Sequence, residues 1–134
     1  MEWTGGKEGR VASPGLPPLE ISSPPEFGGP SGRWTPEHFF VASANVCVLL
    51  TFVALAGFSK LAVRKAGSTA KGRLEKEEGG YRFTGIDVAL AIELERAEDV
   101  ERAERLVRKA EAACLVSRSM STPVTVTPRL TVHQ

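Results

Sequence analysis

The sequence has little cysteine, almost no net charge and no apolar stretch in its first ten residues. Its two cysteines, Cys47 and Cys114, are too few for a disulfide-rich secreted scaffold, and they lack the spacing of a zinc site. Seventeen Lys and Arg residues against sixteen Asp and Glu residues leave a net charge of +1, which predicts neither nucleic-acid binding nor a basic membrane anchor. Residues 1–10 lack the apolar core of a signal peptide. We therefore expect a cytoplasmic protein with reduced thiols.

The 134 residues suit a single domain, 1–134, and 42% hydrophobic with 25% charged residues is typical of a globular protein. The first 34 residues hold seven of the thirteen glycines and six of the nine prolines, which disfavours helix and favours short strands joined by turns. We expect strands at Glu2–Arg10 and Leu19–Ser23, and the alternative is a flexible arm. Three large apolar side chains in this segment are expected to be buried: Trp3, Phe27 and Trp34.

A long uncharged segment begins after residue 34. Thr35-Pro36-Glu37 has the form of a helix start, with a capping residue, a proline in the first turn and an acid near the helix N-terminus. Residues 39–58 carry no charge, and twenty such residues are enough to span a membrane. The polar residues within the run and the α+β pattern that follows it argue against a span. A helix that is apolar all round has to be covered all round, so we expect it at the centre of the fold, wrapped by a sheet and by a second chain.

The residues after this helix predict a hairpin and, later, a closing strand. Strands at Ser68–Lys76 and Tyr81–Glu95 flank a turn sequence at residues 77–80. Apolar and polar residues alternate along the second of these strands, as expected for a sheet with one buried face. Residues 124–132 alternate again, and Pro128 places that strand at a sheet edge or bulge.

Residues Ala97–Cys114 have the spacing of an amphipathic helix. An apolar stripe recurs every three or four residues, and Glu and Arg form i,i+4 pairs on the opposite face. The predicted order is thus N-terminal strands, a long buried central helix, a β-hairpin, an amphipathic helix and a C-terminal strand. This order describes an α+β fold.

The two cysteines both lie on apolar helix faces. Cys47 is in the middle of the uncharged helix and Cys114 is the last member of the apolar stripe, so both are expected to point inward. Buried cysteines usually act as small hydrophobic residues, and packing is therefore one interpretation. The other is chemistry, which needs a thiolate; because burial raises a thiol's pKa, a cation has to reach Cys47. Three candidate cations precede the helix: Lys7, Arg10 and Arg33.

Two motifs resemble those of the osmotically inducible protein C and organic hydroperoxide resistance (OsmC/Ohr) family. TPEHFFVASANVC is similar to its helix-start motif, in which a cysteine follows the glutamate of a Pro-Glu pair by ten positions, here Cys47 after Glu37. AEAACLVS is similar to a second motif, Ala-x-x-x-Cys-Pro-x-Ser, with Cys114 and Ser117 in place and Leu115 where the family usually has proline. WTGGKEGRVAS and SPPEFGG also resemble the family's N-terminal strands. The resemblance covers about residues 1–132 and implies an OsmC-like fold in an intertwined dimer.

This resemblance implies a thiol peroxidase that reduces organic hydroperoxides in the response to oxidative stress. Cys47 would attack an oxygen of the hydroperoxide, release an alcohol and become a sulfenic acid. Cys114 would condense with it to a disulfide, and a dithiol, in the family a protein-bound dihydrolipoyl group, would reduce that disulfide again. No metal or other cofactor is implied.

In the family, the glutamate and an arginine hold one another beside the attacking sulfur. Ten residues of continuous helix place Glu37 about 15 Å from Cys47 of the same chain. We therefore expect each site to take its glutamate from the second, antiparallel chain of a homodimer. For the cation, Lys7 stands in Gly5-Gly6-Lys7 where hydroperoxide-resistance members carry arginine, and the alternatives are Arg10 and Arg33.

A second interpretation keeps the family and drops the chemistry. In it the chain forms an OsmC-like dimer that binds an apolar ligand at its interface, and both cysteines are packing residues. Lys7 and Leu115 depart from the family's motifs and favour this interpretation. The presence of both cysteines and of Glu37 favours the peroxidase.

Overall fold

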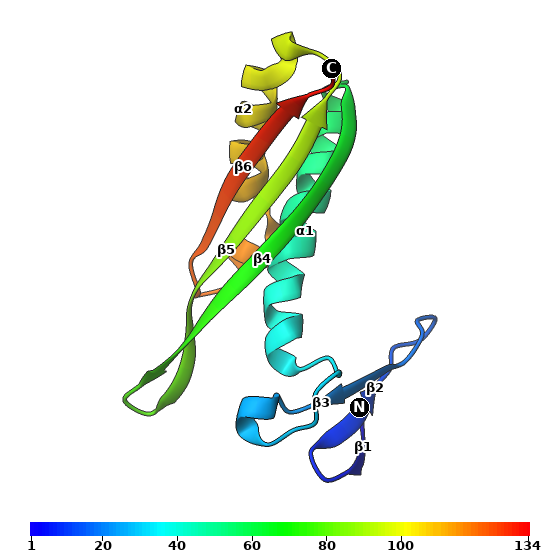
Figure 1. The fold of residues 1–134 in the computed structure, drawn as a ribbon, viewed down its shortest axis with the longest axis vertical. Helices are drawn as coiled ribbons and strands as arrows, with labels where there is room; N and C mark the ends of the chain where they lie inside the picture. The colour runs from blue at the N-terminus through cyan, green and yellow to red at the C-terminus, as the bar shows by residue number, and fades with distance from the viewer. The chain divides into compact units, whose positions relative to one another are not determined.

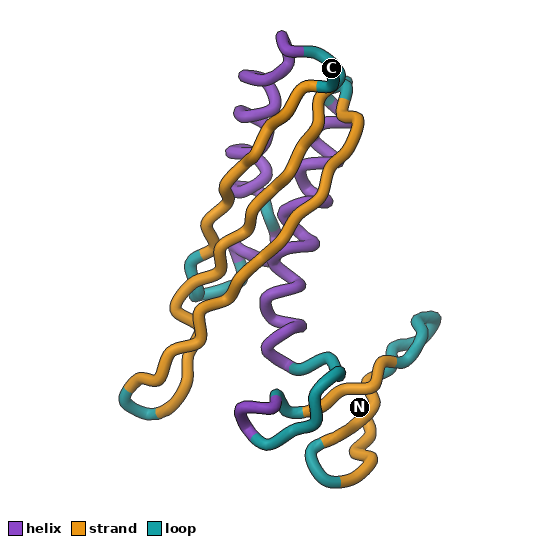
Figure 2. The backbone as a smooth tube through the Cα atoms, viewed as in Figure 1, coloured by secondary structure: helices purple, strands orange, loops and turns teal.

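The computed structural model describes residues 1–134 and contains two three-stranded sheets and three α-helices, which confirms the α+β prediction (Figure 1; Figure 2). By the contacts among its residues the chain divides into two compact units, Met1–Phe40 and Val41–Gln134. The first unit holds β1 (Glu2–Gly5), β2 (Glu8–Val11), β3 (Leu19–Ser22), the 3-10 turn η1 (Pro25–Phe27) and the start of α1 (Pro36–Phe58). The second unit holds the rest of α1, β4 (Val63–Glu77), β5 (Gly80–Leu94), the 3-10 turn η2 (Ala97–Asp99), α2 (Val100–Ala113), α3 (Leu115–Arg118) and β6 (Val124–Val132).

An antiparallel sheet in the order β1-β2-β3 forms most of the first unit. The expectation of one strand over Glu2–Arg10 is wrong, because Gly5 and Gly6 have φ of 132° and 52° and turn the chain back on itself. The segment is instead the hairpin β1–β2. The strand expected at Leu19–Ser23 is confirmed as β3, one residue shorter.

The large side chains of the first unit are less buried than the sequence predicts. Trp3, Phe27 and Trp34 are 70%, 37% and 47% exposed. The cause is the size of the sheet, since three strands of four residues each offer too little area to cover them. Trp34 stacks instead on Phe39, with ring centroids 5.6 Å apart. The segment is thus a folded sheet that leaves aromatic surface uncovered in this chain.

A sheet in the order β4-β5-β6 carries the core of the second unit. β4 and β5 form the predicted antiparallel hairpin, although β4 begins at Val63, five residues before the expected start. β6 pairs in parallel with β5 and is an edge strand, which confirms the placement of Pro128. The predicted alternation is confirmed as well, because five β5 residues are no more than 1% exposed: Ile86, Val88, Leu90, Ile92 and Leu94.

The two long helices cover the buried face of this sheet (Figure 1). α2 contributes four buried side chains: Ala103, Leu106, Val107 and Ala110. α1 contributes four more, one per helical turn: Ala44, Val48, Phe52 and Ala56. The amphipathic helix predicted over Ala97–Cys114 is confirmed, with its first residues in 3-10 form and its helical hydrogen bonding ending at Ala113.

The opposite side of α1 is apolar and uncovered in this chain. Four of its large side chains are between 46% and 86% exposed: Val46, Leu50, Val53 and Phe58. By length and composition α1 is able to cross a membrane, with a mean hydropathy of 2.3 over an 18-residue window, of which 22% is buried. The expected burial on every side is therefore not reached within one chain, and only an apolar partner would remove this side from water.

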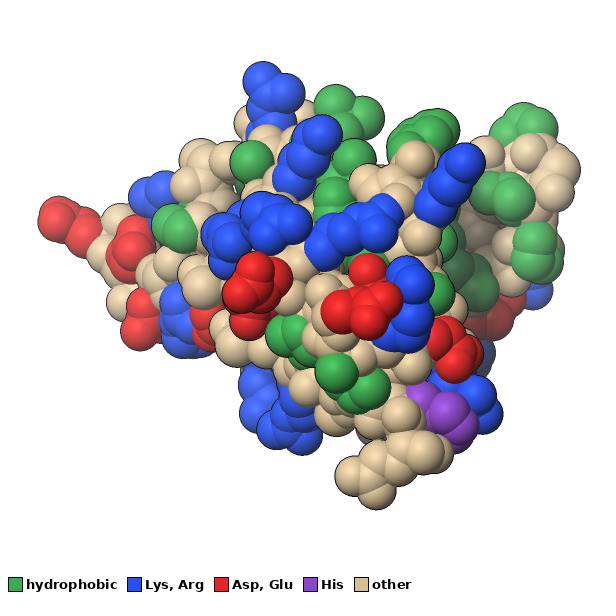
Figure 3. Space-filling model, turned by 90° about the horizontal axis from the view of Figure 1, so that it is seen from above, with side chains coloured by type: hydrophobic (Ala, Val, Ile, Leu, Met, Phe, Trp, Pro, Cys, Tyr) green, Lys and Arg blue, Asp and Glu red, His purple; other side chains and the backbone are tan.

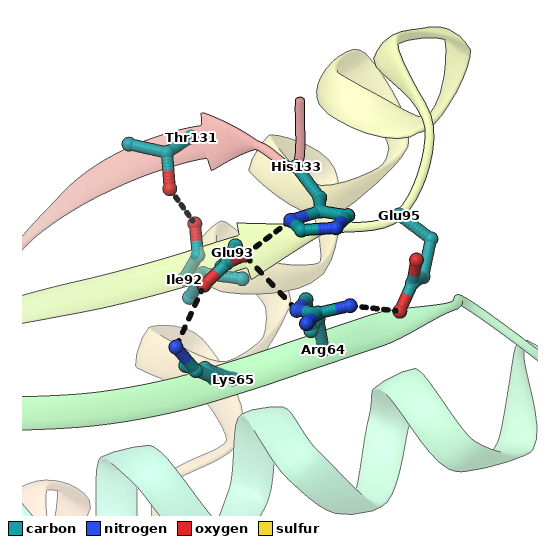
Figure 4. Close-up of polar contacts among 7 residues, drawn as sticks. All are labelled: Arg64, Lys65, Ile92, Glu93, Glu95, Thr131 and His133. Carbon is teal, nitrogen blue, oxygen red and sulfur yellow. Dashed lines mark hydrogen bonds and ion pairs between the residues drawn. The ribbon is translucent and has the colours of Figure 1, made fainter.

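Charged side chains of both signs are interspersed on the face of the molecule seen in Figure 3. One network joins the ends of the three strands of the second sheet, where the Glu93 carboxylate meets Arg64, Lys65 and His133 (Figure 4). Arg64 Nε and His133 Nδ1 each lie 3.2 Å from Glu93 Oε1. The network therefore ties β4, β5 and the residue that follows β6 to one another.

Candidate active site

Cys47 lies in the middle of α1, and its sulfur meets hydrogen-bonding groups of the segment that follows α2. The Cys114 side chain and the main chain at Val116 and Leu115 lie near enough to this sulfur to lower the pKa of its thiol. On its own helix, Thr51 Oγ1 lies 4.0 Å from Cys47 Sγ, one turn further along. The structure thus brings together two cysteines that stand 67 positions apart in the sequence.

The balance of these contacts lowers the pKa of the Cys47 thiol from its usual value of 9.0. Burial is the largest single influence and acts the other way, raising the pKa because it disfavours the charged thiolate. The hydrogen bonds from Cys114, Thr51 and the main chain at 115–116 together outweigh it, since each favours the thiolate. All of these donors are uncharged. The cation expected beside Cys47, from Lys7, Arg10 or Arg33, stays a prediction.

Cys114 occupies the break between α2 and α3. Its φ of −59° and ψ of 112° interrupt the helical backbone, and its side chain is fully buried. The Sγ atom accepts a hydrogen bond from the Ser117 hydroxyl at 3.1 Å and one from the Ser117 N–H at 3.5 Å. Ser117 therefore fixes the second sulfur through two atoms, in addition to satisfying the start of α3.

Glu37 lies in the first turn of α1, within the first unit. Its Oε2 atom is buried and has no hydrogen-bond partner in this chain. Such an atom is rare in folded proteins, because burial removes hydration that a partner normally replaces. α1 is unbroken from Glu37 to Cys47, and the helical rise of about 15 Å between them separates this carboxylate from the sulfur of its own chain.

The three candidate cations of the first unit have partners other than Glu37. These partners are the Phe27 carbonyl for Lys7, the Glu20 carboxylate at 2.6 Å for Arg10 and the Glu8 carboxylate at 3.4 Å for Arg33. The hydrogen bond and the charge of Glu20 raise the pKa of Arg10. Both arginines are therefore held in surface ion pairs, whereas Lys7 has only a neutral partner.

Two features around Cys47 are missed by the sequence reasoning. Thr51 has a detectable signal, since a residue four positions after Cys47 shares its helix face. The main-chain N–H groups of residues 115 and 116 have a weaker sequence signal. Leu115 keeps an N–H that a proline at this position would lack. No group of three His, Cys, Asp or Glu side chains in the chain is arranged to hold a metal ion.

Comparison with known proteins identifies a family whose model matches most of this chain. A family model described as OsmC-like protein matches residues 28–129. That range includes Glu37, Cys47 and Cys114 but begins after Lys7 and Arg10. Among curated proteins, the uncharacterized protein YmaD of Bacillus subtilis (strain 168) is 26% identical over 103 residues, which make up 75% of this chain and 69% of that protein.

Solved structures share the fold over nearly the whole chain. An OsmC-like protein of unknown function from Vibrio cholerae O1 biovar eltor has a TM-score of 0.84 at 19% identity, covering 92% of this chain and 84% of that one. An organic hydroperoxide resistance protein OsmC from Legionella pneumophila has a TM-score of 0.71 at 29% identity, covering 96% of this chain and 92% of that one. The fold is thus common to all three.

Proposed function

The chain belongs to the OsmC-like family, and on that premise we propose that it is a thiol-dependent peroxidase that reduces organic hydroperoxides to alcohols. The observation that carries the proposal is the contact between the Cys47 and Cys114 side chains, at a Cys47 whose pKa is lowered. A thiol of lowered pKa beside a second thiol suits a reaction in which a sulfenic acid forms and is then resolved.

In the first step the Cys47 thiolate attacks the terminal oxygen of the hydroperoxide. An S–O bond forms while the O–O bond breaks, so that the sulfur is oxidised to a sulfenic acid and the peroxide is reduced. The departing alkoxide takes a proton from water and becomes the alcohol. A lowered pKa supports this step because it increases the fraction of thiolate near neutral pH.

In the second step Cys114 resolves the sulfenic acid. Its sulfur attacks the Cys47 sulfur, the S–O bond breaks, and the Cys114 proton leaves with the hydroxyl as water, which gives a Cys47–Cys114 disulfide. Ser117 holds Cys114 Sγ for this step. A dithiol, such as a protein-bound dihydrolipoyl group, then reduces the disulfide by thiol exchange. A cytoplasmic location suits a protein that starts each cycle with both thiols reduced.

An organic hydroperoxide suits the surroundings of Cys47 better than hydrogen peroxide does. α1 carries no charge from Phe39 to Phe58, and its Leu50 side chain is 60% exposed. Leu115, next to Cys114, is 74% exposed. Burying an alkyl chain against such side chains lowers the free energy of binding, whereas hydrogen peroxide has no apolar surface to bury.

In this proposal the active form is a homodimer whose second chain supplies the carboxylate. The uncovered apolar side of α1 and the unpartnered Oε2 of Glu37 both support it. A second copy of α1, packed antiparallel on the first, would cover that side and bring its own Glu37 toward Cys47. The cation that pairs with Glu37 is then Lys7, Arg10 or Arg33, and Lys7 is the one of the three that holds no carboxylate in this chain.

Counting free thiols tests the reaction directly. The reduced protein is mixed with one equivalent of cumene hydroperoxide, and the thiols that remain are titrated. We expect both thiols to be lost in the wild type and the Cys114 thiol to be retained in Cys47→Ser, because that variant lacks the attacking sulfur. Cys114→Ser should accumulate a sulfenic acid that dimedone traps, because it lacks the resolving thiol.

The same experiment separates the peroxidase from the second candidate. A folded wild-type protein whose thiols survive prolonged excess peroxide would refute the proposed reaction. The remaining function would then be a dimer that binds an apolar ligand along α1, with both cysteines as packing residues.

A further inference from the structure

Two hydrogen-bond donors of Ser117 meet the sulfur of the buried Cys114. We propose that the reducing dithiol attacks the disulfide at the Cys47 sulfur, and that Ser117 is the catalytic residue that stabilises Cys114 as it leaves as a thiolate. The inference rests on the proposed peroxidase. It adds to that function the direction in which the disulfide is reduced and a residue that serves this step.

The two cysteines differ in how open they are to a second molecule. The Cys114 side chain is 0% exposed, whereas Cys47 is partly exposed. In thiol–disulfide exchange the attacking thiolate has to reach one sulfur of the disulfide, and the other sulfur departs. Because the buried Cys114 offers no approach to a protein-bound dithiol, the attack falls on Cys47 and the departing sulfur is that of Cys114.

Ser117 provides this departing sulfur with two donors. Its hydroxyl oxygen lies 3.1 Å from Cys114 Sγ and its main-chain nitrogen 3.5 Å, and both groups donate to the sulfur. A neutral thiol is a weak acceptor, whereas hydrogen bonds to a charged acceptor are roughly twice as strong as those between neutral groups. The two donors therefore stabilise a thiolate at Cys114 more than a thiol, and the thiolate is the form in which this sulfur leaves.

The start of α3 does not account for the Ser117 hydroxyl. The N-cap residue of α3 is Cys114, and its side chain already accepts the Ser117 N–H. Ser117 is partly exposed, yet its hydroxyl donates to the buried sulfur. A thiolate that is buried away from water needs donors from the protein, and this hydroxyl is such a donor.

Reduction of the disulfide then takes two exchanges. A thiolate of the dithiol forms a bond to Cys47 Sγ while the bond between Cys47 and Cys114 breaks, and Cys114 keeps the bonding electron pair. The second thiolate of the dithiol attacks the dithiol sulfur of this mixed disulfide and releases Cys47 as a thiolate. The dithiol loses two protons and two electrons and becomes a disulfide, and the two cysteines take up protons from water.

The direction of attack is tested in the wild type without peroxide. The disulfide is formed with diamide and opened with N-acetylcysteine, a monothiol that stays as a mixed disulfide on the sulfur it attacks. Early products are quenched in acid and labelled with N-ethylmaleimide in urea, and the tryptic peptides 34–60 and 110–118 report Cys47 and Cys114. We expect N-acetylcysteine on Cys47 and N-ethylmaleimide on Cys114. The reverse distribution would overturn the proposal.

The role of Ser117 is tested by the rate at which dithiothreitol reduces the same disulfide. Ser117→Ala keeps the N–H at the start of α3 and should fold, which circular dichroism checks, but should be reduced roughly fivefold to fiftyfold more slowly. Ser117→Thr keeps a hydroxyl and should retain most of the rate. Ser119→Ala is the control, because it removes a nearby hydroxyl that donates to the Leu115 carbonyl at 2.9 Å, and should leave the rate unchanged.

Equal reduction rates for Ser117→Ala and the wild type would also overturn the proposal. Because diamide forms the disulfide, these outcomes do not depend on the reaction with peroxide. A disulfide that opens at Cys47 with the expected dependence on Ser117, in a protein that reduces no hydroperoxide, would refute the proposed function and leave this inference standing. An active peroxidase whose disulfide is attacked at Cys114 would refute this inference alone, and a protein that forms no such disulfide with diamide would refute both.

Discussion

The two units of the chain differ in how far a single chain buries their apolar side chains and provides partners for their candidate site residues. In Val41–Gln134 the core of β5 is closed and the two thiols are in contact. In Met1–Phe40, Trp3 and Trp34 remain 70% and 47% exposed, and Glu37 keeps a buried oxygen without a partner. A single chain therefore brings the two thiols of the candidate site together but provides no hydrogen-bond partner for the buried oxygen of Glu37.

The difference follows from the sizes of the two sheets. β4 and β5 each run for 15 residues and have two helices against one face, which gives a continuous apolar layer. The strands of the first sheet have four residues each, and too little of their surface can be buried for them to form a core of their own. The first unit is thus the part of the chain that has most to gain from a second copy.

The largest expected effect is the loss of stability when a core side chain of the second unit is removed. Leu90→Ala removes a fully buried side chain and should lower the free energy of unfolding by about 2–5 kcal/mol. Trp3→Ala, its counterpart in the first unit, should lower it by less than about 1 kcal/mol, because the ring is mostly exposed. Urea denaturation followed by circular dichroism measures both. Equal losses would mean that the first unit has a core of its own, which contradicts the contrast.

The next largest effect is expected at Glu37, whose buried oxygen has no hydrogen-bond partner in this chain. If the Glu37 of the second chain lies beside the reacting sulfur, as proposed, Glu37→Gln should lower kcat/KM for cumene hydroperoxide roughly 10- to 100-fold, because that charge is lost. Glu26→Gln, an exposed acid of the same unit, is the control and should leave kcat/KM unchanged. A Glu37→Gln variant with full activity would remove the carboxylate from the site.

Mixed dimers sharpen the same point. Equal amounts of Glu37→Gln and Cys47→Ser chains, refolded together, give dimers in which one site has both an intact cysteine and an intact glutamate. If each site draws its glutamate from the other chain, roughly a quarter of the wild-type activity should return after random pairing. No recovery above the level of the separate variants would exclude a site shared between chains.

A smaller effect tests the thiols of the second unit through pH. Because the pKa of Cys47 is lowered from 9.0, the folded protein binds fewer protons than the unfolded chain between the folded pKa and pH 9.0. The reduced protein should therefore gain stability as the pH rises through this window, keep the full gain above pH 9.0, and lose it as the pH falls through the folded pKa. Urea denaturation of the reduced wild type and of Cys47→Ser measures the difference. A variant that gains stability as steeply as the wild type would contradict the lowered pKa.

The smallest effect is expected at the ends of the second sheet. Glu93→Gln weakens the network with Arg64, Lys65 and His133 (Figure 4). Because these side chains are partly exposed and screened by solvent, the loss in unfolding free energy should be under about 1 kcal/mol, with kcat/KM unchanged. A marked loss of peroxidase activity would show that the network positions the site.

The elements that depend on local patterning could be predicted from the sequence. The alternation from Ile86 to Leu94 locates β5, and Thr35 locates the start of α1, where the His38 N–H donates to Thr35 Oγ1 at 3.2 Å. Gly5-Gly6 could have been recognised as a turn, and its omission merged two strands into one.

The groups around Cys47 depend instead on how distant segments meet. Which N–H groups reach the sulfur depends on the path of the chain after Ala113, and no periodicity describes that path. The prediction that Trp34 is buried is limited in a similar way. An apolar side chain predicts burial but does not indicate which chain covers it.

The central claim is that the Cys47 and Cys114 sulfurs of one chain react with each other. A mixture of 15N-labelled and unlabelled protein is treated with one equivalent of cumene hydroperoxide, digested with trypsin without reduction and analysed by mass spectrometry. The account predicts that peptide 34–60 is joined by a disulfide to peptide 110–118, with both peptides labelled or both unlabelled. Mixed-label disulfides, or a Cys47 oxidised to sulfinic acid beside a Cys114 that is still reduced, would contradict it.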